Sequence, residues 1–193
     1  MKSLSRLILR LTGWKINGEM PSHIQKCVIL AAPHTSNWDF FYGRLAYFIL
    51  GVPVKFLIKK ESFQNPLGGL LKKLGGIPVD RGRHTNLVEN IARLFHTQKQ
   101  LNVVITPEGT RKLVKEWKKG FYYIALKANV PIVLGFLDYD KKEAGFGLVI
   151  YPSGDFQKDL TAIETFYQDK TARYPENFNL SPQNRLLRKQ RAS

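Results

Sequence analysis

His34 and Asp39 stand five positions apart in the stretch "APHTSNWDF", Ala32 to Phe40, a spacing that could serve proton transfer. A histidine imidazole can accept a proton near neutral pH, and a carboxylate can fix its other ring nitrogen as the donor. The same residues also fit a capping box, with Ser36 as the N-cap and Asp39 at the third helical position. This spacing alone favours the capping box, and the two roles are compatible. Because no separate nucleophile stands out beyond Ser36, the catalytic alternative is a histidine that deprotonates a substrate hydroxyl.

The stretch "TPEGTRK", Thr106 to Lys112, carries groups that suit a phosphate ligand. Gly109 allows a tight turn that leaves backbone N–H groups free near Thr110. Arg111 can bind a phosphate as a bidentate fork, and Glu108 is placed to orient that arginine. The alternative is an ordinary Pro-Glu-Gly turn with a solvated arginine.

Two further stretches contribute basic groups. "GGIPVDR" ends at Arg81, and its two glycines permit a close approach of the backbone to a ligand. "FLIKKES" contains Lys59. The alternatives are a surface Asp-Arg pair, which contributes little energy, and a solvated lysine.

Apolar runs of strand length alternate with helical patterns from residue 26 onward, which predicts an α/β fold. We expect a single-domain sandwich in which helices cover a mostly parallel central sheet. In such sheets sites gather at the carboxyl ends of strands, where the charged residues named above fall. The expected strands are Cys27–Ala32, Val54–Ile58, Ile77–Val79, Val103–Thr106, Ile132–Leu137 and Leu148–Tyr151. Helices are expected after Thr85, over Phe121–Ala128, and from a Thr161/Glu164 capping box to before Pro175.

The N-terminal residues have the pattern of a basic amphipathic helix. Such a helix either lies on an anionic membrane or packs its leucines on the core, and the sequence leaves both open. The apolar face would hold Leu4, Leu7, Ile8 and Leu11, and the basic face Lys2, Arg6 and Arg10.

The chain has 30 Lys and Arg against 15 Asp and Glu, a net charge of +15, which favours anionic partners. Nucleic acid, an anionic bilayer and phosphorylated substrates all fit this charge. Since a spanning helix needs about 20 apolar residues and no run is that long, we expect no spanning helix, and the sequence shows no secretory signal.

Metal and thiol chemistry find little support in the sequence. Cys27, the one cysteine, opens an apolar run and is expected to be a small buried hydrophobe, and it excludes a disulfide within the chain. His23, His84 and His96 are scattered, so no set has metal-ligand spacing. No Walker-A or Gly-x-Gly-x-x-Gly sequence occurs, and we expect neither a metal nor a cofactor.

Taken in order, these stretches resemble the motifs of the glycerolipid acyltransferases, the lysophosphatidic acid acyltransferase superfamily. "PHTSNWD" is similar to its His-x4-Asp motif, "GGIPVDR" to its second block, "TPEGTRK" to its Pro-Glu-Gly-Thr-Arg block and "VPIVLGF" to its apolar fourth block. Lys59 and Glu61 match a Lys-x-Glu element between the first two blocks. The match spans about Lys26 to Phe136 and is that of a short bacterial-type member.

The resemblance implies transfer of a fatty acyl chain from acyl-CoA or acyl-carrier protein to a hydroxyl of a lyso-lipid, usually 1-acyl-glycerol-3-phosphate. It makes His34 the general base and Asp39 its orienting partner, with no covalent enzyme intermediate. Together with the N-terminal pattern and the basic composition of the last residues, it predicts an acyltransferase domain over 21–180, between an amphipathic membrane-associating segment over 1–20 and a basic flexible tail over 181–193, in a peripheral protein at the cytoplasmic face of the membrane. The acceptor site would comprise Lys59, Arg81 and Arg111 around the phosphate, with Glu108, Gly109 and Thr110 shaping it.

Three positions depart from the family pattern and leave the acceptor open. Pro33 precedes the histidine where Asn is frequent, Lys112 follows the arginine where Ser is usual, and Thr106 replaces an aromatic residue. Acylation of an amino-acid lyso-lipid is therefore an alternative. A non-enzymatic protein that binds nucleic acid or an anionic surface is the alternative outside enzymes, although no recognised nucleic-acid-binding motif appears.

Overall fold

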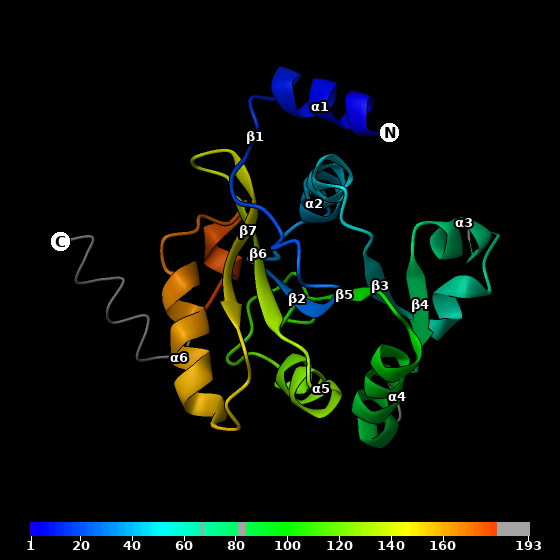
Figure 1. Cartoon of the computed structure of the whole chain (residues 1–193). Helices are drawn as coiled ribbons and strands as arrows, with labels where there is room; N and C mark the ends of the chain where they lie inside the picture. The colour runs from blue at the N-terminus through cyan, green and yellow to red at the C-terminus, as the bar shows by residue number, and fades with distance from the viewer. Residues whose placement is uncertain (67, 81–83, 181–193) are drawn as a thin grey trace.

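Seven strands form one sheet in the order β1-β7-β6-β2-β5-β3-β4, shown in Figure 1. The computed structural model describes residues 1–66, 68–80 and 84–180. All neighbouring strands are parallel except β6 and β7, which pair antiparallel. The strands are β1 (Lys15–Ile16), β2 (Lys26–Ala32), β3 (Lys55–Lys59), β4 (Gly76–Val79), β5 (Leu101–Ile105), β6 (Ile132–Asp138) and β7 (Glu143–Ile150).

Helices cover both faces of the sheet, so the predicted α/β sandwich is confirmed. In Figure 1, α1 and α2 lie above the sheet, whereas α4, α5 and α6 lie below it. Alternating β2 residues divide between the faces: Val28 and Leu30 pack toward α4–α6, and Cys27 and Ile29 pack toward α2. The helices are α1 (Lys2–Leu11), α2 (Asn37–Leu50), α3 (Gly68–Lys73), α4 (His84–Thr97), α5 (Gly120–Ala128) and α6 (Phe156–Tyr167), with 3-10 turns at Lys60–Phe63 and Pro175–Asn177.

The last strand and the last helix differ from the expected bounds. β7 begins at Glu143, five residues before the expected Leu148, because the hairpin after β6 extends the antiparallel pairing. α6 begins at Phe156, and the predicted Thr161 cap is wrong. Asp155 caps the helix by accepting from the N–H groups of Gln157 and Lys158, at 3.1 Å each.

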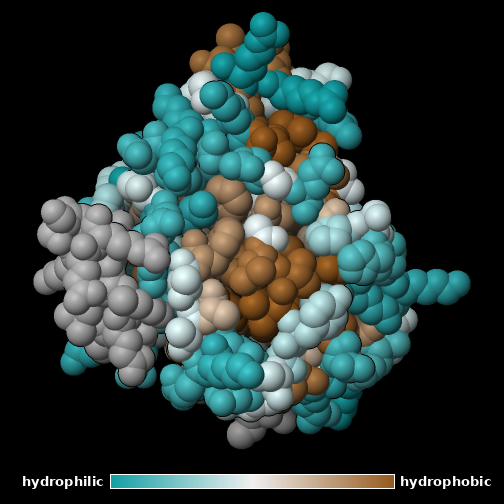
Figure 2. All heavy atoms as spheres, turned by 60° about the vertical axis from the view of Figure 1, so that its left-hand side comes forward, coloured by the Kyte–Doolittle hydropathy of each residue, from teal (hydrophilic) through white to brown (hydrophobic). Residues whose placement is uncertain are grey.

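Helix α1 rests on α2 mainly through residues outside the predicted apolar face, although Ile8 of that face packs in the same cluster as Leu9. Ser5 and Leu9 are the residues of α1 that become buried. Leu4, Leu7 and Leu11 each remain more than half exposed. At the top of Figure 2, where α1 lies, apolar side chains accordingly reach the surface among hydrophilic ones. The tail over 181–193 lies outside the described residues.

Candidate active site

The loop between β2 and α2 holds His34 at the carboxyl end of the central strand. Ser36 caps α2 by accepting from the Trp38 N–H at 3.1 Å. Asp39 Oδ2 accepts from the N–H groups of Thr35 and Ser36, at 2.7 Å each. The predicted capping box is therefore confirmed, and it fixes the position of Asp39 relative to the loop.

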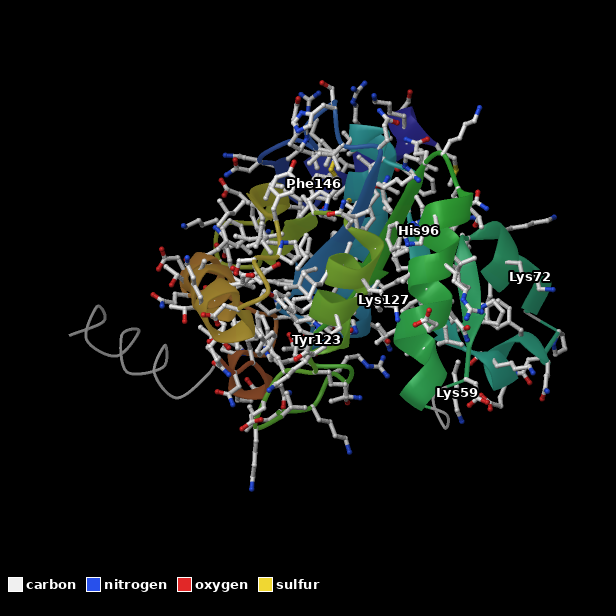
Figure 3. All side chains as sticks on the ribbon, turned by 60° about the horizontal axis from the view of Figure 1, so that its bottom comes forward. Lys59, Lys72, His96, Tyr123, Lys127 and Phe146 are labelled. Carbon is white, nitrogen blue, oxygen red and sulfur yellow. The ribbon has the colours of Figure 1, made fainter. Side chains whose placement is uncertain are left out.

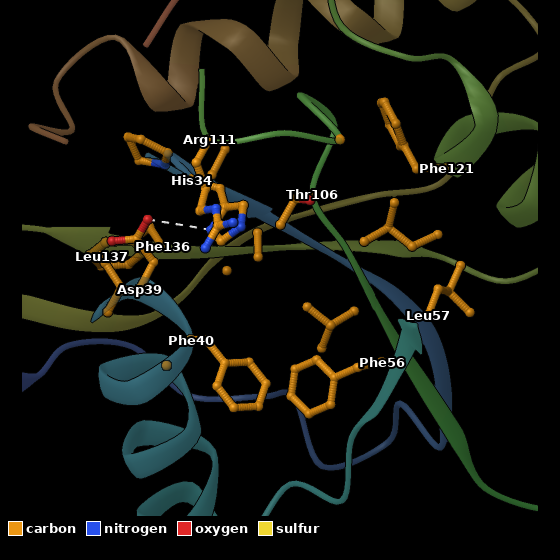
Figure 4. Close-up of a pocket in the computed structure, with 18 of the residues that line it drawn as sticks. His34, Asp39, Phe40, Phe56, Leu57, Thr106, Arg111, Phe121, Phe136 and Leu137 are labelled. Carbon is orange, nitrogen blue, oxygen red and sulfur yellow. Dashed lines mark ion pairs between the residues drawn. The ribbon is translucent and has the colours of Figure 1, made fainter. Parts of the chain in front are cut away.

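The same carboxylate oxygen faces the histidine. His34 Nδ1 lies 3.3 Å from Asp39 Oδ2, the contact drawn as a dashed line in Figure 4. Asp39 is buried and His34 is partly exposed. Since Nδ1 faces the carboxylate, Nε2 is the imidazole nitrogen available to a substrate. The structure thus brings the two predicted residues together, and the cap and the pair share one aspartate.

Tyr139 holds the other oxygen of Asp39. Its hydroxyl donates to Asp39 Oδ1 at 2.6 Å. Burial of the phenol and this contact with the carboxylate raise the pKa of Tyr139 well above its ordinary value, which keeps the hydroxyl a donor. The Tyr139 N–H in turn donates to the Thr171 carbonyl at 2.9 Å, which fixes the residue after β6.

Glu108 supports the histidine from beneath the loop. Its side chain is 1% exposed, and Oε1 accepts from the His34 backbone N–H at 3.0 Å. Oε2 is buried and has no hydrogen-bond partner among the described residues. Burial raises the pKa of Glu108 to about 8, against the effect of the backbone hydrogen bonds. No hydrogen bond or ion pair between Glu108 and Arg111 occurs in the described part of the chain.

A cavity of about 570 Å³ opens beside the His34–Asp39 pair, between α2 and the carboxyl ends of β3 and β5. His34, Asp39, Thr110 and Arg111 line its polar part. Apolar side chains line the rest, and Figure 4 shows the rings of Phe40 and Phe56 side by side, with their centroids 5.1 Å apart. The cavity therefore joins proton-transfer groups to an apolar compartment.

The "TPEGTRK" segment reaches this cavity from β5. Gly109 has a φ of +64°, the left-handed conformation that the predicted tight turn requires. Arg111 Nη1 donates to Asn37 Oδ1 at the start of α2. Lys118 also lines the cavity, and its ammonium lies beside Gly109, in the space that a Cβ would take at that position. Two cations thus flank the turn.

The remaining predicted basic residues are placed differently. Lys59 ends β3, is exposed and pairs with Glu61 at 3.7 Å. It does not line the cavity. Figure 3 shows Lys59 where α4 begins, with His96 toward the opposite end of that helix. Arg81 lies outside the described residues.

Sequence reasoning assigned no role to Tyr139, Asn37 or Lys118. Tyr139 follows β6, which is parallel to β2 and ends at the same edge of the sheet. The strand-end rule that selected His34 would therefore also have selected Tyr139. Asn37 and Lys118 gave no comparable signal, because their roles depend on how two loops meet.

The expectation for Cys27 is confirmed: the thiol is buried, lies 3.2 Å from Asn102 Oδ1, and burial raises its pKa to about 12. Among the described residues, no cluster of His, Cys, Asp and Glu could hold a metal ion. Within the same residues, no helix has the length and apolar character needed to cross a bilayer.

A sheet with a His-Asp pair and an arginine turn at its carboxyl edge is the arrangement expected for the family named above. A family model described as Acyltransferase matches residues 15–133. The chain therefore belongs to the acyltransferase family, which confirms the resemblance.

Three known proteins illustrate the relationship. The 1-acyl-sn-glycerol-3-phosphate acyltransferase of Limnanthes alba is 29% identical over 133 residues, covering 66% of this chain and 46% of that protein. The enzyme of the same name from Cocos nucifera is 30% identical over 134 residues, covering 66% of this chain and 42% of its own length. The chain thus spans less than half the length of these relatives.

The third is a solved structure. The crystal structure of the 1-acyl-sn-glycerophosphate (LPA) acyltransferase PlsC from Thermotoga maritima superimposes with a TM-score of 0.60 at 16% identity. The superposition covers 86% of this chain and 74% of that one. At this identity the comparison shows a shared fold.

Proposed function

We propose that the chain is an O-acyltransferase that moves a fatty acyl group from a thioester, acyl-CoA or acyl-carrier protein, to a hydroxyl of a lyso-lipid. The acceptor that fits best is 1-acyl-glycerol-3-phosphate. The observation that carries this proposal is the His34–Asp39 pair at the polar end of a largely apolar cavity. The names of the relatives support the same acceptor.

His34 acts as the general base in this proposal. Its Nε2 takes the proton of the acceptor hydroxyl while Asp39 stabilises the imidazolium through Nδ1. Tyr139 and the two loop N–H groups hold the carboxylate, so the ring keeps its orientation. Glu108 accepts a hydrogen bond from the backbone N–H of His34. It therefore contributes to the acceptor site indirectly, by holding the histidine in place.

The deprotonated oxygen attacks the thioester carbonyl carbon and forms a tetrahedral oxyanion. Collapse of this intermediate breaks the carbon–sulfur bond, and the leaving thiolate takes the proton from the His34 imidazolium. The products are an ester and a free thiol, and the enzyme returns to its starting state. No covalent enzyme intermediate is formed, since the attacking oxygen belongs to the acceptor.

The phosphate of the acceptor lies at the arginine turn in this scheme. Arg111 offers a planar fork of donors, oriented by Asn37, and Lys118 adds a second positive charge across Gly109. Gly109 and Thr110 shape this end of the cavity. The roles of Arg81 and Lys59 stay predictions.

The acyl chain occupies the apolar part of the cavity. Phe40 from α2 meets Phe56 and Leu57 from β3, and Phe121 from α5 borders the same space. Burial of hydrocarbon there contributes about 0.8 kcal/mol per methylene group. This compartment favours a long acyl chain over a nucleotide or a polar metabolite as the reacting partner.

Helix α1 attaches the protein to a membrane in this proposal. Leu4, Leu7 and Leu11, whose packing the sequence left open, are exposed and stand beside exposed basic residues. That combination is typical of a helix lying in the interface of an anionic bilayer. The cytoplasmic side of the membrane stays a prediction.

A product assay tests the proposal. The chain is incubated with acyl-CoA or acyl-carrier protein and a panel of lyso-lipids that includes 1-acyl-glycerol-3-phosphate and an amino-acid lyso-lipid. Mass spectrometry then reads the products. We expect phosphatidic acid from the first acceptor. The proposed activity would be contradicted if no acceptor were acylated with either donor.

A further inference from the structure

An exposed aromatic patch with an arginine at its centre lies beside the catalytic loop. Trp38, Phe41, Arg173 and Tyr174 make up this surface, hereafter the Trp38 patch. Trp38 is 48% exposed, whereas Trp14 and Trp117 are 6% and 7% exposed. The Trp38 and Phe41 rings meet edge to face at 5.6 Å, and the Arg173 guanidinium lies 5.4 Å from the Trp38 ring and 5.8 Å from the Tyr174 ring.

The patch is attached to the groups that orient His34. Trp38 directly precedes Asp39 in α2. The Tyr174 N–H donates to Thr35 Oγ1 at 3.2 Å, so the segment after α6 is tied to the catalytic loop. Arg173 also lies 5.8 Å from the ring of Tyr139, whose hydroxyl holds Asp39. A surface that binds the patch therefore sits next to the catalytic pair.

Aromatic contacts connect the patch with α1. Trp38 lies 6.0 Å from the Tyr42 ring, and Tyr42 stacks on Trp14 at 4.5 Å. Trp14 follows α1, and its N–H donates to the Leu9 carbonyl at 2.8 Å. The helix α1 that carries the exposed leucines and the helix α2 that carries Trp38 thus lie together on one side of the sheet.

The composition of the patch fits a bilayer interface. Tryptophan and tyrosine favour the headgroup level, where one edge of the ring is apolar and the other is hydrated. Within the described residues, Arg173 forms no ion pair with a carboxylate, so its charge is available to an anionic headgroup. The net charge of +15 favours an anionic membrane over one that lacks anionic lipids.

We infer that the Trp38 patch inserts into the interface of an anionic bilayer and, together with α1, holds the catalytic loop against the membrane surface. Trp38 and Phe41 enter the boundary between headgroups and acyl chains, and Arg173 binds a lipid phosphate. The consequence for catalysis rests on the proposed function: a lyso-lipid would reach His34 without leaving the bilayer. The binding itself does not depend on that function.

Tryptophan fluorescence tests this inference. The full chain is mixed with vesicles of phosphatidylcholine and phosphatidylglycerol whose phosphatidylcholine carries brominated acyl chains, which quench indoles that reach them. Because Trp14 and Trp117 are buried, we expect quenching through Trp38. Trp38→Phe should remove the quenching, and it leaves the helix cap intact because the cap uses the backbone of residue 38. Sedimentation with the vesicles without quenching, or no binding at all, would overturn the inference.

A matched pair of arginine variants tests the charge. Arg173→Gln should weaken binding to the anionic vesicles about five-fold, the factor that corresponds to about 1 kcal/mol for a basic side chain near such a surface. Arg93→Gln on α4 also removes one exposed positive charge, but from the opposite side of the sheet. This variant should bind the vesicles as the wild type does. Equal affinities of both variants would count against a role for Arg173 in the patch.

Acyl transfer measured in parallel separates the two proposals. The assay uses short-chain donors and acceptors that dissolve without a bilayer, so the patch is not required. Acyl transfer without quenching of Trp38 would overturn the membrane insertion of the Trp38 patch and leave the proposed acyltransferase activity standing. Quenching of Trp38 without acyl transfer would overturn the proposed function and leave the membrane insertion of the patch standing.

Discussion

Glu108 makes the stability of the protein depend on pH in a predictable direction. The carboxyl is buried beneath the catalytic loop, and its pKa is raised from 4.5 to about 8. In the unfolded chain the group ionises above about pH 4.5, whereas in the folded chain it stays protonated until about pH 8. Its contribution to stability is therefore full below the unfolded pKa and is lost as the pH rises through the folded one.

The size of the effect follows from the two pKa values. At about 1.4 kcal/mol per tenfold change in proton activity, the interval from 4.5 to about 8 sets an upper bound on the order of 5 kcal/mol. For a chain of this size that corresponds to a fall in melting temperature on the order of 10 °C.

Glu108→Gln isolates this contribution. The glutamine oxygen can accept the His34 N–H as Oε1 does, and the amide does not titrate. Melting temperatures of the wild type and the variant are compared at about pH 5 and about pH 8. We expect the wild type to lose stability relative to the variant as the pH rises. Because other titrating groups are common to both proteins, their effects cancel in the difference.

Glu116→Gln in the same loop is the control, because Glu116 is exposed. It should follow the wild type at both pH values. If the wild type and Glu108→Gln lost the same stability between the lower and the higher pH, Glu108 would not be a buried protonated acid. Its place beneath the loop would then be wrong.

Three further substitutions probe the site. Tyr139→Phe should lower kcat about tenfold with little change in KM, since it removes one hydrogen bond to a charged carboxylate, while Tyr42→Phe should leave kcat unchanged. Arg111→Gln should raise KM for a phosphate-bearing acceptor on the order of tenfold and spare a phosphate-free monoacylglycerol, and equal losses for both acceptors would refute phosphate binding. Gly43→Leu places a side chain in the apolar cavity and should lower kcat/KM for long acyl donors on the order of tenfold while short donors are retained; an unchanged chain-length profile would show that the acyl chain lies elsewhere.

The sequence was sufficient for β2 to β6, whereas the two-residue strand β1, which pairs parallel with β7, was not predicted. Buried parallel strands such as Cys27–Ala32 read as continuous apolar runs, because both faces are covered by helices. The Ser36 capping box was equally readable, since it depends on residues within one turn. The start of α6 was misplaced because Thr161 and Glu164 have capping-box spacing inside the helix, where the Thr161 hydroxyl bonds the Gln157 carbonyl.

The site was predictable to the extent that its members lie at strand ends. The contacts of His34 with Glu108, and of Asp39 with Tyr139, join residues 74 and 100 positions apart. No local pattern records such contacts, because they depend on the strand order. The exposure of the α1 leucines likewise depends on the α2 surface, where Leu9 finds its packing partners.

Thiol release by the His34→Ala variant is the most direct test of the central claim. The wild type and the variant are mixed with acyl-CoA and 1-acyl-glycerol-3-phosphate, free thiol is measured over time, and circular dichroism confirms that both are folded. The backbone N–H of residue 34 still reaches Glu108 in the variant, so the loop should be retained. The proposed role of His34 predicts that acceptor-dependent thiol release falls by roughly 10²–10⁴-fold. A folded variant that releases thiol at the wild-type rate would contradict it.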